Sequence, residues 1–238
     1  KADGICGPAT VIGLMRLVKV VSGGAPTQLR ENAARIVKGP ALANKVIVLD
    51  PSSEVHDSEI CFDIAQRLEG RLIALGVAVF LTRSANSHPL EAERIITSNQ
   101  SGADLVLSLN IDHYKNDLAH GVATSYYGSD AHGVHSVVGE RFATLVQREI
   151  CARTDLLNLR THAKTWDFLR LTKAPTVRID LGYISNPGDA KRLADKDFRE
   201  AVVESIVVAV QRLYLAAEDD AKTGTLRISD LRNAGLRK

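Results

Sequence analysis

Cysteines, aromatic residues and long apolar runs are all scarce in this sequence. The three cysteines, Cys6, Cys61 and Cys151, lie far apart in the 238 residues, and none belongs to a Cys-x-x-Cys pair. Their odd number and wide spacing argue against a disulfide framework or a cysteine-based metal site, so we predict buried structural thiols. Apolar runs such as residues 206–210 are a handful of residues long, whereas a membrane-spanning helix needs about 20. No transmembrane segment is therefore predicted.

An excess of charge of one sign is also missing. The formal net charge is +2 at pH 7, which is too small for the basic field of a nucleic-acid-binding protein. Residues 1–8 lack the charged and then apolar segments of a signal peptide. With no export signal and no disulfides, we expect a cytoplasmic protein that does not bind nucleic acid.

Strand-like and helix-like segments alternate along the middle of the chain. Short apolar runs predict strands at residues 45–49, 77–81, 104–110, 121–127 and 176–181, the fourth of them at or near an edge. Apolar residues at helical spacing predict helices over residues 60–75, 90–101, 138–150 and 198–213. This alternation predicts an α/β three-layer sandwich, with a mixed, mostly parallel sheet and helices on both faces. Ligands of such sheets gather at the carboxyl ends of strands, which directs attention to residues 50–53, 108–112 and 180–186.

The two ends of the chain differ from this middle region. Gly23, Gly24 and Pro26 break the chain, so we assign residues 23–44 to a linker and residues 45–215 to the main domain. Residues 216–238 change to charged and small residue types, which predicts a flexible C-terminal tail.

Several separated motifs carry a resemblance to a known family. They are Asp50-Pro51 after the first strand, Leu-Thr before Arg83, Ala-Asp-Leu-Val-Leu-Ser-Leu at residues 103–109, and Gly-Tyr-Ile-Ser before Asn186. In this order and spacing they resemble the zinc-dependent N-acetylmuramoyl-L-alanine amidases, which cut peptidoglycan. The resemblance covers residues 45 to about 214. Residues 3–10 resemble the end of a small peptidoglycan-binding repeat, to which we assign residues 1–22.

The resemblance implies a zinc site whose ligands are partly absent here. In the family, a His, a Glu and a second His hold the metal, an open position takes water, and a late Glu acts as general base. Ser53 stands at the first His position, Asn110 at the second, and Asp180 at the position of the base. The Glu ligand is matched by Glu59 or by Asp57. Two of three ligands are then lost and the base is one methylene shorter, so we expect no catalytic residues and no bound cofactor.

Other residues offer a rebuilt metal site. The candidates are His56 with Asp57 and Glu59, His113 with Asp112, and His132 with His135. His56 is the best of them because it follows the right strand, and zinc would be the cofactor if it served as a ligand. The interpretation we favour is that all of these are solvated histidines.

Two further features have structural interpretations that we favour. Arg83 is expected to pair with Glu91 or Glu93, and not to serve a site. Residues 160–175 are rich in basic and hydroxyl groups around Trp166, the only tryptophan. This segment would suit an anionic ligand, such as a sugar nucleotide or a carboxylated peptide, but we favour a solvated loop and helix that anchors Trp166 and Phe168 in the core.

The degenerate turns, together with Thr223 and Thr225 in the tail, resemble an actinobacterial subfamily of amidase-like regulators. That resemblance implies a non-hydrolytic protein that activates the UDP-N-acetylglucosamine enolpyruvyl transferase after a Ser/Thr kinase phosphorylates these threonines. A forkhead-associated protein and the lipid II flippase are further implied partners. Two alternatives stay open: an active zinc-dependent amidase that hydrolyses peptidoglycan, and a module that only binds muropeptides.

Overall fold

The computed structural model describes residues 42–54, 57–129 and 134–214, which form an α/β domain. Its strands are β1 (Val46–Pro51), β2 (Ala78–Leu81), β3 (Leu105–Asp112), β4 (Val122–Ser129), β5 (Val134–His135), β6 (Asn158–Lys164) and β7 (Thr176–Tyr183). Its helices are α3 (Ser58–Ala74), α4 (Glu91–Gln100), α5 (Val137–Arg153), α6 (Asp167–Leu171), α7 (Pro187–Ala194) and α8 (Lys196–Tyr214). The predicted repeat, most of the linker and the predicted tail lie outside the described residues.

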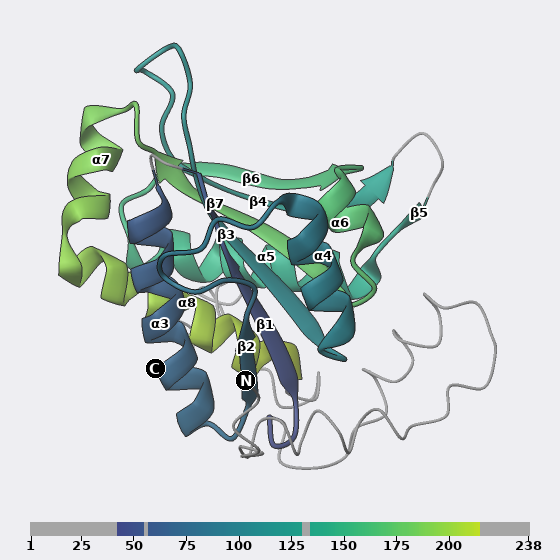
Figure 1. The fold of residues 1–238 in the computed structure, drawn as a ribbon. Coiled ribbons are helices and arrows are strands. Elements are labelled where there is room, and N and C mark those ends of the chain that lie inside the picture. The colour runs from purple at the N-terminus through teal and green to yellow at the C-terminus, as the bar shows by residue number, and fades with distance from the viewer. Residues whose placement is uncertain (1–41, 55–56, 130–133, 215–238) are drawn as a thin grey trace, which may run out of the picture.

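The strands form one mixed sheet with the order β2-β1-β3-β7-β4-β5, and β6 pairs with β4. β2, β1, β3 and β7 run parallel to one another, whereas β4 is antiparallel to β7 and parallel to β6. Helices cover both faces of the sheet (Figure 1). The predicted fold class is therefore confirmed, and the fourth predicted strand lies one strand in from the edge.

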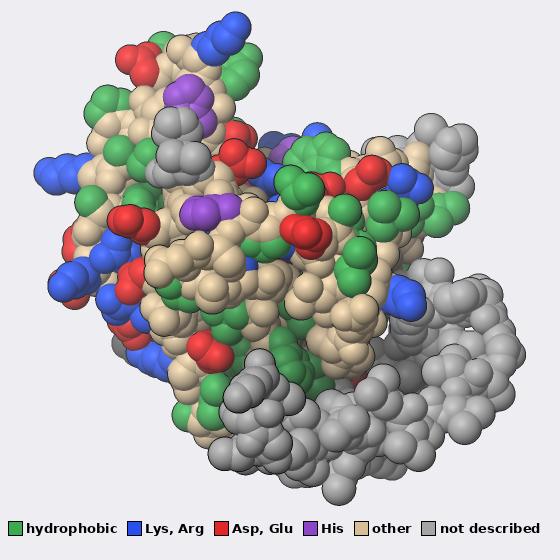
Figure 2. All heavy atoms as spheres, in the orientation of Figure 1, with side chains coloured by type: hydrophobic (Ala, Val, Ile, Leu, Met, Phe, Trp, Pro, Cys, Tyr) green, Lys and Arg blue, Asp and Glu red, His purple; other side chains and the backbone are tan. Residues whose placement is uncertain are grey.

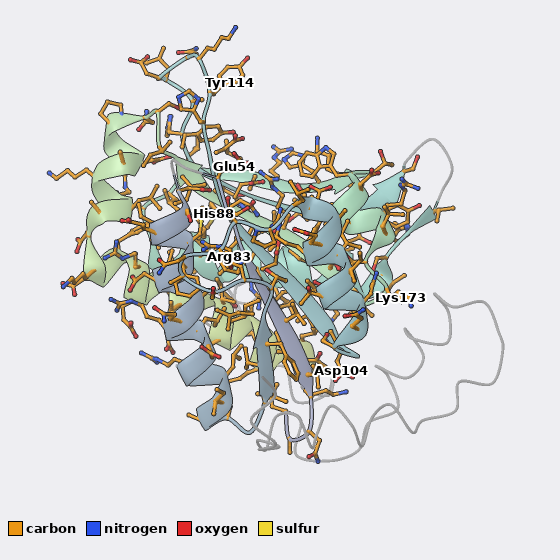
Figure 3. All side chains as sticks on the ribbon, in the orientation of Figure 1. Glu54, Arg83, His88, Asp104, Tyr114 and Lys173 are labelled. Carbon is orange, nitrogen blue, oxygen red and sulfur yellow. The ribbon has the colours of Figure 1, made fainter. Side chains whose placement is uncertain are left out.

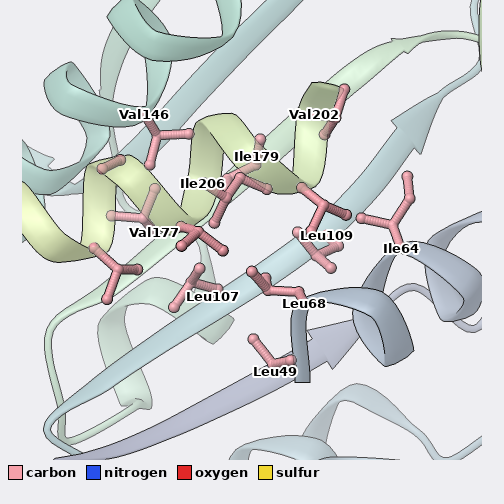
Figure 4. Close-up of a cluster of buried hydrophobic side chains, with 14 of the residues drawn as sticks. Leu49, Ile64, Leu68, Leu107, Leu109, Val146, Val177, Ile179, Val202 and Ile206 are labelled. Carbon is pink, nitrogen blue, oxygen red and sulfur yellow. The ribbon is translucent and has the colours of Figure 1, made fainter. Parts of the chain in front are cut away.

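The main core lies between the sheet and helices α3, α5 and α8. Alternate residues of β3, including Leu107 and Leu109, point into it together with Ile64 of α3 and Ile206 of α8 (Figure 4). Because successive side chains of a strand point to opposite faces, Ser108 and Asn110 lie on the other side of β3. Each fully buried leucine or isoleucine contributes about 1.5–3 kcal/mol of hydrophobic stabilisation, so this face dominates the folding energy.

The opposite face of the sheet has only a small apolar cluster. It joins Val48 and Val106 of the sheet to Ile95 of α4 and Phe168 of α6. The rest of that face carries polar side chains, and α4 and α6 cover it only in part. The polar site described below lies on this face.

The segment 158–164 differs from its prediction. We expected a solvated loop and helix over residues 160–175, but residues 158–164 form β6, an edge strand that pairs in parallel with β4. The strand has no apolar run, because its side chains alternate between exposed and partly buried positions. Phe168 is buried as expected, whereas Trp166 is 43% exposed, so the predicted anchoring of the tryptophan in the core is wrong.

Candidate functional site

The three polar turns meet at the carboxyl ends of β1, β3 and β7, as the sequence predicts. Asp50 of β1 lies opposite Ser108 of β3, and Asn110 of β3 lies opposite Asp180 of β7. All four side chains are buried. In the space-filling view, acidic, basic and histidine side chains gather on the upper part of the face that carries α4, where these strands end (Figure 2).

Asp50 is the central acceptor of the site. Its carboxylate accepts hydrogen bonds from Thr82 Oγ1 at 2.6 Å, Ser108 Oγ at 2.8 Å and Arg94 Nη1 at 2.7 Å. Asn110 extends this network by donating from Nδ2 to Ser108 Oγ at 3.0 Å. Burial raises the pKa of Asp50, and Arg94 and the hydrogen bonds oppose that rise. Asp50 of β1 therefore connects β3, the residue that follows β2, and helix α4 through hydrogen bonds.

Asp57 lies in the site, whereas Glu59 does not. Asp57 is buried and accepts hydrogen bonds from Ser52 Oγ at 2.9 Å and from the backbone N–H of Ile111 at 3.0 Å. Burial raises the pKa of Asp57, and these bonds oppose the rise. Glu59 is exposed on α3. Of the two carboxylates left open by the sequence, the geometry brings Asp57 to the strand ends.

Asp180 is held by an arginine two residues before it on the same strand. Arg178 Nε donates to Asp180 Oδ1 at 2.7 Å. Burial raises the pKa of Asp180, while Arg178 opposes the rise and Asp112 and Asp57 add to it. A general base must present a free oxygen to water, and here one carboxylate oxygen is already taken by a cation.

Ser53, His113 and His135 form no metal-binding group with these carboxylates in the described part of the chain. Ser53 is partly buried, and its carbonyl oxygen lies 3.1 Å from His88 Nδ1, a histidine that the sequence interpretation did not consider. His135 lies on β5 and pairs with Glu140 at 3.2 Å, and His113 lies on the exposed loop after β3. His56 and His132 lie outside the described residues. Within the described ranges, no group of three or more His, Cys, Asp or Glu residues is placed to hold a metal ion.

Arg83 does not pair with Glu91 or Glu93, so that prediction is wrong. Its side chain is 5% exposed and donates to the carbonyl oxygens of Pro51 at 3.0 Å, Ser52 at 2.7 Å and Ser58 at 2.7 Å. The guanidinium also lies 5.0 Å from the ring centroid of Phe62. Figure 3 shows Arg83 below Glu54 and His88, at the turn that follows β1. Arg83 therefore holds the turn after β1 against the start of α3 through hydrogen bonds to backbone carbonyls of both.

A groove of about 480 Å³ opens beside the strand ends, between α4 and α6. Ser108 and Asn110 of β3 and Arg178 of β7 line it from the sheet, and Arg94 of α4 and Trp166 line it from the sides. Sequence analysis singled out Trp166 but missed both arginines. Arg178 could have been identified from the sequence, because it lies two residues before Asp180 on a predicted strand and so faces the same side of the sheet.

Comparison with known proteins places the chain in a family. The model of the family described as N-acetylmuramoyl-L-alanine amidase (Amidase_3) matches residues 47–212. The chain is also 41% identical over 244 residues to the N-acetylmuramoyl-L-alanine amidase CwlM of Mycobacterium tuberculosis, covering 97% of this chain and 60% of that protein. The chain belongs to the N-acetylmuramoyl-L-alanine amidase family. It spans less than two thirds of the length of this relative.

Solved amidase structures share the fold of this family member. The catalytic domain of CwlV from Bacillus (Paenibacillus) polymyxa var. colistinus superimposes with a TM-score of 0.63 and 22% identity, covering 70% of this chain and 96% of that domain. AmiC2 of Nostoc punctiforme gives a TM-score of 0.63 and 21% identity, covering 74% of this chain and 98% of that one. Among the described residues, no helix has the length and apolarity to cross a membrane.

The described residues of this amidase-family site do not fit a zinc ion, and the candidate ligand His56 lies outside them. Zinc sites in proteins use thiolate, imidazole or carboxylate ligands, usually three or four of them. Ser53 offers a neutral hydroxyl, and Asn110 turns its amide nitrogen toward Ser108. Asp57 is the one remaining carboxylate at a ligand position, and its two oxygens already accept hydrogen bonds from Ser52 and Ile111.

Proposed function

We propose that this chain is a pseudoenzyme: an amidase-fold protein that regulates peptidoglycan precursor synthesis and does not hydrolyse peptidoglycan. One observation supports the claim that the chain does not hydrolyse peptidoglycan. At the strand ends, the imidazole positions hold Ser53 and Asn110, and Asp180 is paired with Arg178 at 2.7 Å. A polarised water needs both a metal and a free base, and these replacements, together with the Arg178–Asp180 ion pair, support the absence of hydrolysis.

The regulatory role is proposed from the resemblance of the sequence to a subfamily of regulators. The degenerate motifs and the tail threonines Thr223 and Thr225 resemble those of actinobacterial amidase-like regulators. Accordingly, we propose a cytoplasmic protein that activates the UDP-N-acetylglucosamine enolpyruvyl transferase once a Ser/Thr kinase has phosphorylated the tail. Phosphate adds close to two negative charges and three strong acceptors, which is sufficient to create a new docking surface. A forkhead-associated protein and the lipid II flippase are the further partners of this proposal.

Two alternatives keep specific support. The family match over residues 47–212 and the name of the Mycobacterium tuberculosis relative, an N-acetylmuramoyl-L-alanine amidase, favour an active zinc amidase. The groove beside the strand ends favours a module that binds muropeptides without cutting them.

Metal and hydrolysis assays separate these functions. We expect purified protein to carry no stoichiometric zinc by elemental analysis and to release no peptide from muropeptides. One zinc per chain, together with cleavage that a chelator abolishes, would establish the active amidase instead. Muropeptide binding without cleavage or activation would favour the binding module.

The tail is tested by replacing both threonines. The double variant Thr223→Ala, Thr225→Ala should fail to activate the enolpyruvyl transferase after kinase treatment, while phosphorylated wild type activates it. Circular dichroism should show the same fold in both. Equal activation by the two proteins would refute the tail as the switch.

A further inference from the structure

The groove between α4 and α6 reaches the sheet. Its volume of about 480 Å³ lies in the range of small-molecule sites, roughly 300–1,000 Å³. Ser108 and Asn110, which line it from β3, are 4% and 7% exposed, so a ligand in the groove would contact buried polar groups. A docked protein surface would not enter to this depth, which favours a small ligand.

Arg178 offers unused donors to this groove. Within the described part of the chain, its Nε donates to Asp180, and its two terminal nitrogens make no hydrogen bond. A guanidinium presents paired N–H groups whose geometry matches a phosphate or a carboxylate. This side of the groove is therefore suited to an anionic group.

Trp166 forms a flat wall next to that arginine. Trp166 is 43% exposed, although it is the largest side chain that lines the groove. The guanidinium carbon of Arg178 lies 5.1 Å from the indole centroid, and Lys164 Nζ lies 5.4 Å from it. Both cations lie over the ring, and the part of the indole that stays exposed is suited to hold a planar ring by stacking and to place an attached anion near the positive charges.

Acceptors complete the lining. Asn110 uses its Nδ2 for Ser108, and among the described residues its Oδ1 accepts no hydrogen bond. Glu91 lies exposed at the start of α4, on the rim of the groove. A carboxylate in that position accepts hydrogen bonds from the hydroxyls of a sugar. The other carboxylate of the lining, Asp167, is taken by Arg170 at 2.7 Å.

We propose that this groove binds a nucleoside diphosphate, with the base on Trp166, the phosphates at Arg178 and Lys164, and sugar hydroxyls at Glu91. A carboxylated peptide would use the arginine but would leave the flat wall and the rim acceptor unexplained. The proposal goes beyond the regulatory function and does not depend on it, because it rests on the groove alone.

The single tryptophan of the chain gives a direct assay. The fluorescence of Trp166 in the full chain is titrated with ADP, GDP and UDP, and in parallel with inorganic pyrophosphate. We expect saturable quenching by at least one nucleoside diphosphate. Calorimetry should show that pyrophosphate, which lacks the ring, binds at least 10-fold more weakly. Absence of saturation by all three nucleotides at millimolar concentration would overturn the proposal, and so would equal affinity for pyrophosphate.

Matched variants locate the site. By calorimetry, Arg178→Gln should weaken nucleotide binding by about 10-fold or more, since a charged donor pair is lost. Arg71→Gln, which removes an exposed arginine of α3 that is outside the lining and pairs with no lining residue, should bind as wild type does. Trp166→Leu should also lose about 10-fold, and this half-exposed position keeps the test valid if Arg178→Gln does not fold. Wild-type affinity in Trp166→Leu would refute the assignment.

Discussion

Replacing Arg83 by leucine is expected to destabilise the domain strongly. The substitution removes three hydrogen bonds to the carbonyl oxygens of Pro51, Ser52 and Ser58, as well as the contact with the ring of Phe62. A buried acceptor left without a donor costs about 1–3 kcal/mol, and water reaching part of the turn lowers the sum. We therefore expect a loss of about 3–5 kcal/mol in the free energy of unfolding, measured by urea denaturation. For a domain of this size, that corresponds to a drop in Tm of roughly 6–20 °C.

Arg71 supplies the matched control. It lies on the surface, where it pairs with Glu200 and Glu204, and its side chain is 45% exposed. Arg71→Leu should cost less than about 1 kcal/mol, because exposed ion pairs contribute little. If Arg83→Leu costs no more than Arg71→Leu does, then Arg83 behaves as a surface residue, as its sequence context suggested, and our account of the turn fails.

Two further predictions concern the carboxylates. The triple variant Ser53→His, Asn110→His, Asp180→Glu should bind zinc, measured by elemental analysis after dialysis, and adding Asp57→Asn should abolish that binding. Zinc binding by the triple variant that survives Asp57→Asn would show that another residue completes the ligand set. For Glu149 of α5, burial acts to raise the pKa, but its arginine partners more than offset this, and the pKa is lowered. Its ionised form therefore stabilises the fold above the ordinary glutamate pKa of about 4.3, and this stabilisation is lost as pH falls through the lower folded-state pKa. Glu149→Gln should be less stable than wild type at pH 7, and urea denaturation at acidic pH should show the two converging; a constant difference would contradict the assignment.

The sequence predicted the central strands because they are buried on both faces. β1 and β3 read as short apolar runs, and the polar residues that follow them mark the strand ends where the site lies. β6 could not be predicted in the same way, because a half-exposed edge strand is held by backbone pairing with β4 and needs few apolar side chains.

Side-chain partners were harder to predict than strands. Arg83 lies within reach of two glutamates in sequence, but its actual acceptors are backbone carbonyls, which no residue pattern reveals. Whether Asp57 or Glu59 enters the site depends on where α3 begins relative to β3. The conformation of the short turn before α3 determines this position, and the sequence does not reveal it. The neutralisation of Asp180 by Arg178 follows from their alternate positions on one strand, once the buried face of that strand is known.

The hydrogen-bond network of Asp50 bears on how such a protein can change over evolutionary time. Asp50, Thr82, Ser108 and Arg94 hold the walls of the cleft with contacts among themselves. A substitution at Ser53, whose resemblance to a metal-ligand position comes from the sequence alone, therefore need not disturb the frame, whereas a substitution of Asp50 would leave buried donors unpaired. Chemistry and architecture depend on different residues here, so a lineage of such proteins is free to lose catalysis in a few steps and still inherit a cleft of defined shape.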